Sequence, residues 1–232
     1  MRTSFWTKLL DVISPRMCAI CGERLSANER VLCAACHLHL PLTHYEEQPL
    51  DNPMARLFWG LFPVERAAAL FFYQPQAPVS RLIFDMKYHH QPEVAEHMGS
   101  IMARQFAAAG FFDGIDALVP MPITWLRRWK RGYNQSHELA RGISEVTALP
   151  IYNDVVKRVR FRQSQTKQHA WDRLRNVEDA FRLVRPERIA GRHLLLIDDI
   201  VTTGATITAC ASELAKVPDV RISILSLGLT KP

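Results

Sequence analysis

Uninterrupted apolar runs alternate along this chain with segments whose apolar residues recur at helical spacing. The apolar runs predict strands over residues 66–73, 117–121, 194–197 and 221–227. Helical spacing predicts helices over residues 79–88, 93–109, 134–148 and 205–216, with Gly110 ending the second. Strands that are apolar on both faces and alternate with helices are typical of a buried parallel sheet. The pattern therefore predicts an α/β fold with a central parallel sheet flanked by helices.

The first part of the chain departs from this pattern, because it has few strand signals and contains four of the five cysteines. A polar, proline-containing segment follows it. At 232 residues, the chain is long enough for one α/β core with a small appended module. We therefore expect a cysteine module over residues 1–44, a linker over 45–65 and an α/β domain over 66–232.

The chain is basic, with a net charge of +6 and a pI of about 9.2. Such a charge favours anionic partners, either small phosphates or nucleic acid. No apolar run approaches the roughly 18 to 20 residues that a membrane span needs, so we expect none. The opening residues lack a small-residue cleavage site, and Asp11 interrupts their apolar stretch. We therefore expect no signal peptide and a cytoplasmic location.

The most informative motif begins where the predicted strand 194–197 ends. Asp198 and Asp199 follow that strand directly. The next helix opens on Thr202, Thr203, Gly204, Ala205 and Thr206. Ligands of parallel sheets bind beyond the carboxyl ends of strands, and a helix N-terminus offers unpaired N–H groups to a phosphate. Carboxylates repel a phosphate at close range, so the acidic pair is better suited to ribose hydroxyls. The alternative is a buried strand followed by a threonine-capped helix without a ligand.

Four cysteines form two CxxC pairs near the N-terminus, at Cys18, Cys21, Cys33 and Cys36. Each short pair can place two thiolates on one tetrahedral Zn²⁺ ion. Four sulfur ligands close such a site, so we expect a structural zinc ion. The alternatives are disulfides or reduced redox pairs, which a cytoplasmic location disfavours. Whether the module only stabilises the fold or also contacts a partner or nucleic acid stays open.

A basic arm lies between the strand 117–121 and the helix 134–148. It contains Arg127, Arg128, Lys130 and Arg131. Cations near the carboxyl edge of a sheet could stabilise a departing pyrophosphate, together with Mg²⁺. Two alternatives stay open. One is a solvated basic face anchored by Trp129, and the other is a surface for single-stranded DNA built from cations and aromatic rings.

The segment from Asp198 to Thr206 resembles the ribose-phosphate loop of type I phosphoribosyltransferases. The resemblance implies that Asp198 and Asp199 are the catalytic acids that hold the ribose hydroxyls. It also implies that residues 202–206 hold the 5′-phosphate of phosphoribosyl pyrophosphate, with Mg²⁺ on the pyrophosphate. The strand end at residues 118–122 is similar to the pyrophosphate-side loop of that family.

Further motifs resemble a narrower group, the ComF/GntX-type competence proteins. These motifs are the cysteine pairs, residues 131–135 (RGYNQ), and Gln165 and Thr166 followed by Arg173 and Asn176. The resemblance implies a type I phosphoribosyltransferase fold with an N-terminal four-cysteine zinc module. Members of this group are associated with DNA uptake and with use of DNA as a nutrient. By the same resemblance, Arg173 is the main phosphate contact of a polar segment, residues 163–176, that covers the site. The alternative is an ordinary polar connection.

Two functions follow from these features. The first is a phosphoribosyltransferase, a pentosyl-transferring glycosyltransferase, that binds phosphoribosyl pyrophosphate with Mg²⁺ and transfers the ribose phosphate to a nitrogenous base. Arg127, Arg128 and Arg131 would then contact the substrate. The second is a non-catalytic module that senses phosphoribosyl pyrophosphate or a nucleotide, or binds single-stranded DNA or a DNA-import protein. The acidic pair favours the enzyme, while the surplus of positive charge and the cysteine module favour a nucleic-acid role.

Overall fold

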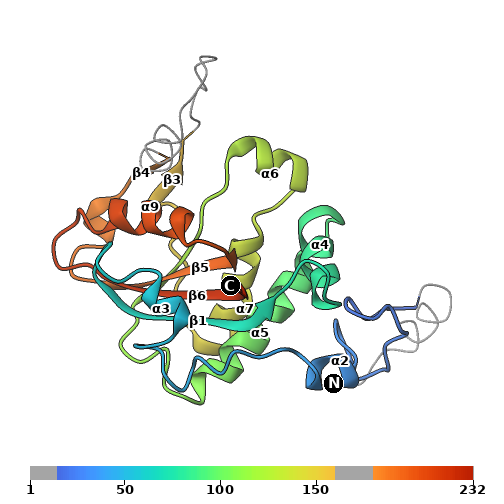
Figure 1. Ribbon diagram of the computed structural model, residues 1–232. Helices are drawn as coiled ribbons and strands as arrows, with labels where there is room; N and C mark the ends of the chain where they lie inside the picture. The colour runs from blue at the N-terminus through green and yellow to red at the C-terminus, as the bar shows by residue number, and fades with distance from the viewer. Residues whose placement is uncertain (1–14, 160–179, 232) are drawn as a thin grey trace, which may run out of the picture.

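The computed structural model of the chain describes residues 15–159 and 180–231 (Figure 1). Its centre is a four-stranded sheet in the order β1-β6-β5-β2. The strands are β1 (Val64–Tyr73), β2 (Ala117–Pro120), β5 (His193–Val201) and β6 (Arg221–Thr230). All three pairings are parallel, so the carboxyl ends of the strands meet at one edge of the sheet.

The residues of β5 explain why the sheet separates two hydrophobic cores. Leu195 and Ile197 belong to one core, whereas Leu194 and Leu196 belong to the other. Successive side chains of a strand point to opposite faces, and all four of these are fully buried. A strand covered on both faces has no position for a polar side chain until it reaches the sheet edge, where Asp198 follows.

Helices cover both faces of the sheet. The first face is covered by α4 (Val79–Tyr88), α5 (Pro92–Ala107) and α7 (Gln135–Thr147). The second face is covered by α3 (Pro53–Arg56) and α9 (Ala205–Leu214). Figure 1 shows these two layers on either side of the strands. The predicted α/β architecture is therefore confirmed, with strand and helix ends that differ from the expected bounds by a few residues.

Helices α5 and α7 approach each other through two glycines. A Cβ atom on Gly142 would lie 1.8 Å from the carbonyl oxygen of Glu96, and one on Gly99 would lie 2.1 Å from the carbonyl oxygen of Leu139. No side chain fits at either position. The contact holds α7 against α5, and the amino end of α7 reaches the carboxyl edge of the sheet, where Ser136 contacts Asp198.

The segment expected to link the cysteine module to the α/β domain packs into the second core. Asn52 accepts hydrogen bonds from the backbone N–H groups of Met54 and Ala55, which begins α3. The Asn52 side chain also donates to the carbonyl oxygen of Ala67 in β1. Met54 and Phe58 are fully buried. The domain boundaries at residues 44 and 65 stay a prediction.

The remaining elements lie around the sheet. They are α2 (Ala34–Leu38), α6 (Trp125–Arg131), β3 (Val156–Arg158), β4 (Phe181–Leu183) and the 3₁₀ turn η1 (Pro186–Arg188). Strands β3 and β4 form an antiparallel ribbon. Figure 1 shows α6 and this ribbon projecting from the body of the molecule. Among the residues that the structure describes, no helix has the length and apolarity needed to cross a membrane.

Candidate functional site

The acidic pair lies at the carboxyl end of β5. Asp198 Oδ1 accepts hydrogen bonds from the backbone N–H of Asp199 at 2.9 Å and from the Ser136 hydroxyl at 3.2 Å. Asp199 Oδ1 accepts from the backbone N–H of Ile200 at 2.7 Å. Each carboxylate therefore has one oxygen, Oδ1, fixed by a backbone N–H of the chain itself.

The loop after β5 encloses a small hollow of about 50 Å³. It is lined by Asp198 and by residues 200–207, which include all five loop residues predicted to hold a phosphate. Gly204 has a φ of +76° and directly precedes α9, whose first turn has no side-chain cap. The N-cap residue therefore offers no capping side chain, and Thr203 accepts only a long hydrogen bond of 3.5 Å from the N–H of Ala205. The N–H groups that open α9 are the kind of donors that an anion site needs.

Gly204 is required at this position for two reasons. Its backbone is in the left-handed region, which favours glycine. In addition, a Cβ atom there would lie 2.8 Å from Cε1 of Phe58, a fully buried ring from the segment after α3. The shape of the loop thus depends on the segment that the sequence pattern presented only as a linker.

Lys87 completes the acidic end of the site and was missed in the sequence analysis. Its Nζ lies 2.8 Å from Oδ2 of Asp199, and both side chains are largely buried. Lys87 comes from the end of α4, more than a hundred residues earlier in the chain. A lysine followed by Tyr88 and two histidines is not a motif in itself, so only the fold places it here.

Burial raises the pKa of Asp198 to about 7, and the neighbouring Asp199 charge adds to the increase. The backbone N–H of Asp199, the Ser136 hydroxyl and the Lys87 ammonium act in the opposite direction. The carboxyl group is therefore close to its midpoint of ionisation at neutral pH. A cation or a hydroxyl donor that binds beside it would favour the ionised form.

A second, larger hollow of about 420 Å³ lies at the carboxyl end of β2, beside Pro120. Arg128 from α6 and Lys157 and Arg158 from β3 line it, together with Asn134 and His137 of the α6–α7 region. Burial lowers the pKa of Arg158, with Arg127 adding to the decrease and Asp198 opposing it. We call this space the cationic hollow.

The predicted basic arm forms helix α6, which the sequence pattern did not predict. Thr124 caps it by accepting from the backbone N–H of Arg127, and Gly132 ends it with a φ of +76°. Arg131 donates to Gln135 at 3.0 Å and lies over the ring of Tyr88. Trp129 is 71% exposed, so it does not anchor this face as one alternative supposed.

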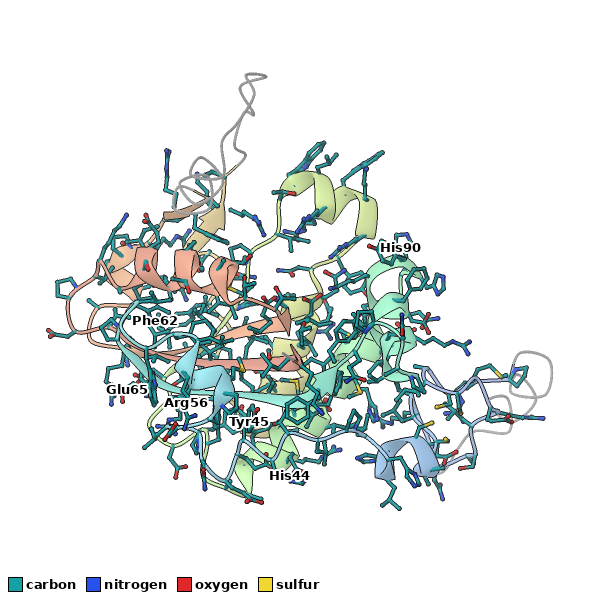
Figure 2. All side chains as sticks on the ribbon, in the orientation of Figure 1. His44, Tyr45, Arg56, Phe62, Glu65 and His90 are labelled. Atoms are coloured by element: carbon teal, nitrogen blue, oxygen red, sulfur yellow. The ribbon has the colours of Figure 1, made fainter. Side chains whose placement is uncertain are left out.

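The structure thus brings the acidic pair, the loop 202–206 and Arg128 to one edge of the sheet. Arg127 lies close enough to affect Arg158, whereas Arg131 turns toward α4 and Tyr88. His90, labelled in Figure 2 at the end of α4, lies against the same turn, because a Cβ atom on Gly132 would be 3.1 Å from its Nδ1. Arg173 and the expected covering segment 163–176 lie outside the described residues.

The four cysteines near the N-terminus come together, as the sequence predicts. Their sulfur atoms all lie within 4.8 Å of one another, and those of Cys21 and Cys33 are 3.8 Å apart. A tetrahedral zinc ion with Zn–S bonds of about 2.3 Å would place its sulfur ligands about 3.8 Å apart. The cluster could therefore bind a zinc ion.

Backbone N–H groups also favour the thiolate form in this cluster. Although burial acts in the opposite direction, hydrogen bonds from the backbone of Cys21, Cys33 and Ile20 lower the pKa of Cys18 to about 6. The N–H of Cys36 donates to the sulfur of Cys33 at 3.4 Å. Burial and the neighbouring cysteines instead raise the pKa of Cys36, so four thiolates would need the charge of a bound metal ion.

Fold and site together define the class of protein. It is an α/β protein with an acidic pair and a phosphate-type loop at the carboxyl end of a central parallel strand, and with a separate four-cysteine centre.

Comparison with known proteins gives the family. The chain is 30% identical over 203 residues to the DNA utilization protein YhgH of Escherichia coli K12, an alignment that covers 86% of this chain and 84% of that protein. It is 34% identical over 114 residues to competence protein F of Haemophilus influenzae, covering 49% of this chain and 50% of that protein. This chain belongs to the ComF family of DNA utilization and competence proteins. The resemblance to the ComF/GntX-type group is thereby confirmed, and the structure confirms the central parallel sheet flanked by helices and the four-cysteine cluster near the N-terminus.

Two solved structures illustrate the more distant likenesses. The glutamine phosphoribosylpyrophosphate amidotransferase of B. subtilis is 17% identical with a TM-score of 0.39, over 58% of this chain and 26% of that one. The hypoxanthine phosphoribosyltransferase of Trypanosoma cruzi is 16% identical with a TM-score of 0.37, over 59% of this chain and 68% of that one. No protein-family model matches the sequence.

Proposed function

We propose that this protein binds phosphoribosyl pyrophosphate with Mg²⁺ and transfers its ribose phosphate to a nitrogenous base, in the setting of DNA uptake or use of DNA as a nutrient. One observation carries the proposal. The acidic pair at the end of β5 is followed at once by a glycine-containing loop that surrounds a small hollow at the N-terminus of α9. The names of the relatives support the DNA-related setting.

Each part of the site has a separate task in this proposal. The loop 202–206 binds the 5′-phosphate with the N–H groups that open α9 and with its threonine hydroxyls. Asp198 and Asp199 accept hydrogen bonds from the ribose hydroxyls. Arg128 and the other cations of the cationic hollow bind the pyrophosphate, with Arg127 and Arg131 extending this charge along α6. Arg173 stays a proposed phosphate contact.

The reaction requires no covalent intermediate with the protein. The bond between C1 of the ribose and the pyrophosphate oxygen breaks, a bond between C1 and the acceptor nitrogen forms, and the acceptor loses a proton. The Mg²⁺ ion supplies charge neutralisation on the pyrophosphate as it leaves. The protein contributes orientation of the two reactants and positive charge at the leaving group.

Pyrophosphate release tests this function. Purified protein is incubated with Mg²⁺, phosphoribosyl pyrophosphate and a panel of nucleobases. We expect release with at least one base, and a decrease of roughly 100-fold or more in an Asp198→Asn, Asp199→Asn variant, because neutral amides would replace the charged acceptors of the ribose hydroxyls. Release no faster than in the variant for every base would reject the transferase, and the binding of the sugar phosphate alone would then identify a sensing module.

A second candidate function rests on α6. Trp125 and Trp129 are 67% and 71% exposed on a helix that also carries Arg127, Arg128 and Lys130. Cations that follow a phosphate backbone and rings on which bases stack are the two elements of single-stranded DNA binding. We propose this surface as the one by which the protein contacts single-stranded DNA, with DNA-import proteins as further partners.

Salt dependence separates the two elements of that surface. Replacing Arg127, Arg128, Lys130 and Arg131 by glutamine should weaken retention of labelled single-stranded DNA and reduce its dependence on salt. The matched Trp129→Ala change should weaken retention with the salt dependence unchanged, because stacking releases no counterions. Retention that neither change affects would reject the surface.

The four-cysteine cluster completes the proposal as a structural zinc site of a cytoplasmic protein. Thiolates persist in a reducing compartment, and four sulfur ligands leave no position for a substrate. Elemental analysis should find about one zinc ion per chain. Its absence from protein purified without chelator would reject the zinc assignment.

A further inference from the structure

Two hollows of different chemistry are linked to the acidic pair, each through one cation. Arg158 lines the cationic hollow and interacts electrostatically with Asp198. The other hollow lies between the carboxyl end of β1 and helix α4, and it has a volume of about 520 Å³. Lys87 belongs to its lining and also contacts Asp199, so this side chain connects the second hollow to the acidic pair. We call this second hollow the aromatic hollow.

Three ring side chains give the aromatic hollow its character. Tyr73 comes from the last position of β1, while Phe84 and Tyr88 come from one face of α4. The rings of Phe84 and Tyr88 are 4.8 Å apart between centroids. Both remain exposed, by 50% and 59% of their surfaces, whereas Phe rings of the hydrophobic cores, such as Phe58, Phe71 and Phe106, are fully buried.

The polar groups of the aromatic hollow are few and lie at its margins. Ser80 and Arg81 come from the first turn of α4, and Lys87 comes from its last turn. Lys87 is already paired with Asp199. A phosphate would find more cations in the cationic hollow, where Arg128, Lys157 and Arg158 belong to the lining together with one carboxylate, that of Glu138. The aromatic hollow is therefore suited to a flat, largely apolar group with a few hydrogen-bonding atoms on its rim.

We propose that the aromatic hollow is the acceptor subsite, and that it binds a planar nitrogen heterocycle of the nucleobase class by stacking on Tyr88 and Phe84. This inference rests on the proposed function, because the heterocycle must lie next to C1 of a ribose held by Asp198 and Asp199. The pyrophosphate then leaves on the opposite side, into the cationic hollow. Lys87 marks the boundary between acceptor and ribose.

Binding of a nucleoside monophosphate tests the subsite, since such a molecule joins the phosphate, ribose and base in one ligand. The probes are ribose 5-phosphate, AMP, GMP and UMP, measured by calorimetry with the full chain and Mg²⁺. We expect at least one nucleotide to bind more tightly than ribose 5-phosphate. Tyr88→Ser and Phe84→Ser should each weaken the affinity for that nucleotide by roughly 5- to 100-fold, and leave the affinity for ribose 5-phosphate unchanged. Both side chains are exposed, so these variants should fold normally.

The matched control is Trp59→Ser, which removes an exposed ring (51%) from the segment after α3, outside the aromatic hollow. It should leave both affinities unchanged. A loss of nucleotide affinity in this control, with none in the Tyr88 and Phe84 variants, would place the base elsewhere and overturn the subsite. Nucleotides that bind no more tightly than ribose 5-phosphate would overturn it as well. Failure of every phosphate ligand to bind would instead reject the proposed function.

Discussion

Asp198 is held where its charge is unfavourable. Burial and the adjacent Asp199 raise its pKa to about 7, above the 3.8 of a free aspartate. A raised carboxyl pKa means that the folded chain favours the protonated form. Stability is therefore unaffected below about pH 4, decreases as the pH rises toward 7, and stays lowered above that. This loss of stability is inherent in a site that keeps a carboxylate ready for a ligand.

Asp198→Asn should consequently raise the melting temperature of the protein without ligand and without Mg²⁺, and the gain should depend on pH. We expect about 1 kcal/mol or more at pH 8, equivalent to roughly 2–4 °C, and little gain near pH 4.5. Asn keeps an oxygen that can accept from Ser136, so the packing is preserved. Thermal unfolding at both pH values measures the difference. Asp113→Asn, at an exposed aspartate outside the site, serves as the control; a gain independent of pH would contradict the explanation.

At the same scale, the sequence predicted some site residues and missed others for a physical reason. Asp198, Asp199 and the loop 202–206 are adjacent in the chain, so their geometry follows from one strand-to-helix turn. Lys87 and Ser136 reach the acidic pair from two other helices. Their contacts depend on how those helices pack, and no local pattern encodes that packing.

At the scale of elements, the loop between β5 and α9 is fixed by Gly204 and Phe58. Gly204→Ala should weaken ribose 5-phosphate binding by more than 10-fold, because the buried Phe58 ring cannot yield and the loop must shift. Gly191→Ala is the matched control, since Gly191 has a similar φ of +69° but open space around it. Gly191→Ala should lower the free energy of unfolding only by roughly 1–2 kcal/mol, which is the strain of an alanine in the left-handed region. Calorimetry and thermal unfolding of both variants separate the two effects; equal losses of affinity would contradict this account.

The contact between α5 and α7 gives a prediction with an unexpected sign. Replacing glycine by alanine inside a helix normally stabilises it by about 1 kcal/mol. Gly142→Ala should instead destabilise the protein by about 3 kcal/mol or more, because the new Cβ atom would lie 1.8 Å from the carbonyl oxygen of Glu96. Val146→Ala, at an exposed position of the same helix, should be close to neutral. Chemical denaturation measures both, and a stabilised Gly142→Ala variant would show that the helices are farther apart.

The periodicity of apolar residues predicted α5 and α7 but not how closely they pack, because a glycine within a helical pattern indicates only a position of low helix propensity. The periodicity also failed to predict α6, because this short helix of tryptophans and cations has no buried residue. Burial against the sheet is what produces a periodic pattern. Elements that project from the body, such as α6, leave no such signal.

At the scale of the whole molecule, the cysteine module is continuous with the α/β domain. Cys18, Ile20 and Leu25 belong to the same hydrophobic core as helices α4 and α5. A Cβ atom on Gly22 would lie 2.6 Å from Nη1 of Arg81, so the first cysteine turn rests directly on α4. The aromatic hollow lies along this same helix. The module therefore supports one wall of the proposed acceptor subsite.

Removing zinc should consequently destabilise the entire chain. Zinc that binds only the folded form adds its binding free energy to the stability of the protein. Chelation should therefore lower the free energy of unfolding by several kcal/mol, within a single melting transition. It should also weaken nucleotide binding more than ribose 5-phosphate binding. Cys18→Ser should reproduce both effects, whereas Cys210→Ala should keep the metal, because Cys210 lies in the other core. Calorimetric scans with and without chelator measure this. Two separate transitions, or a main transition that chelation leaves unchanged, would show that the module folds independently and that α4 does not depend on it.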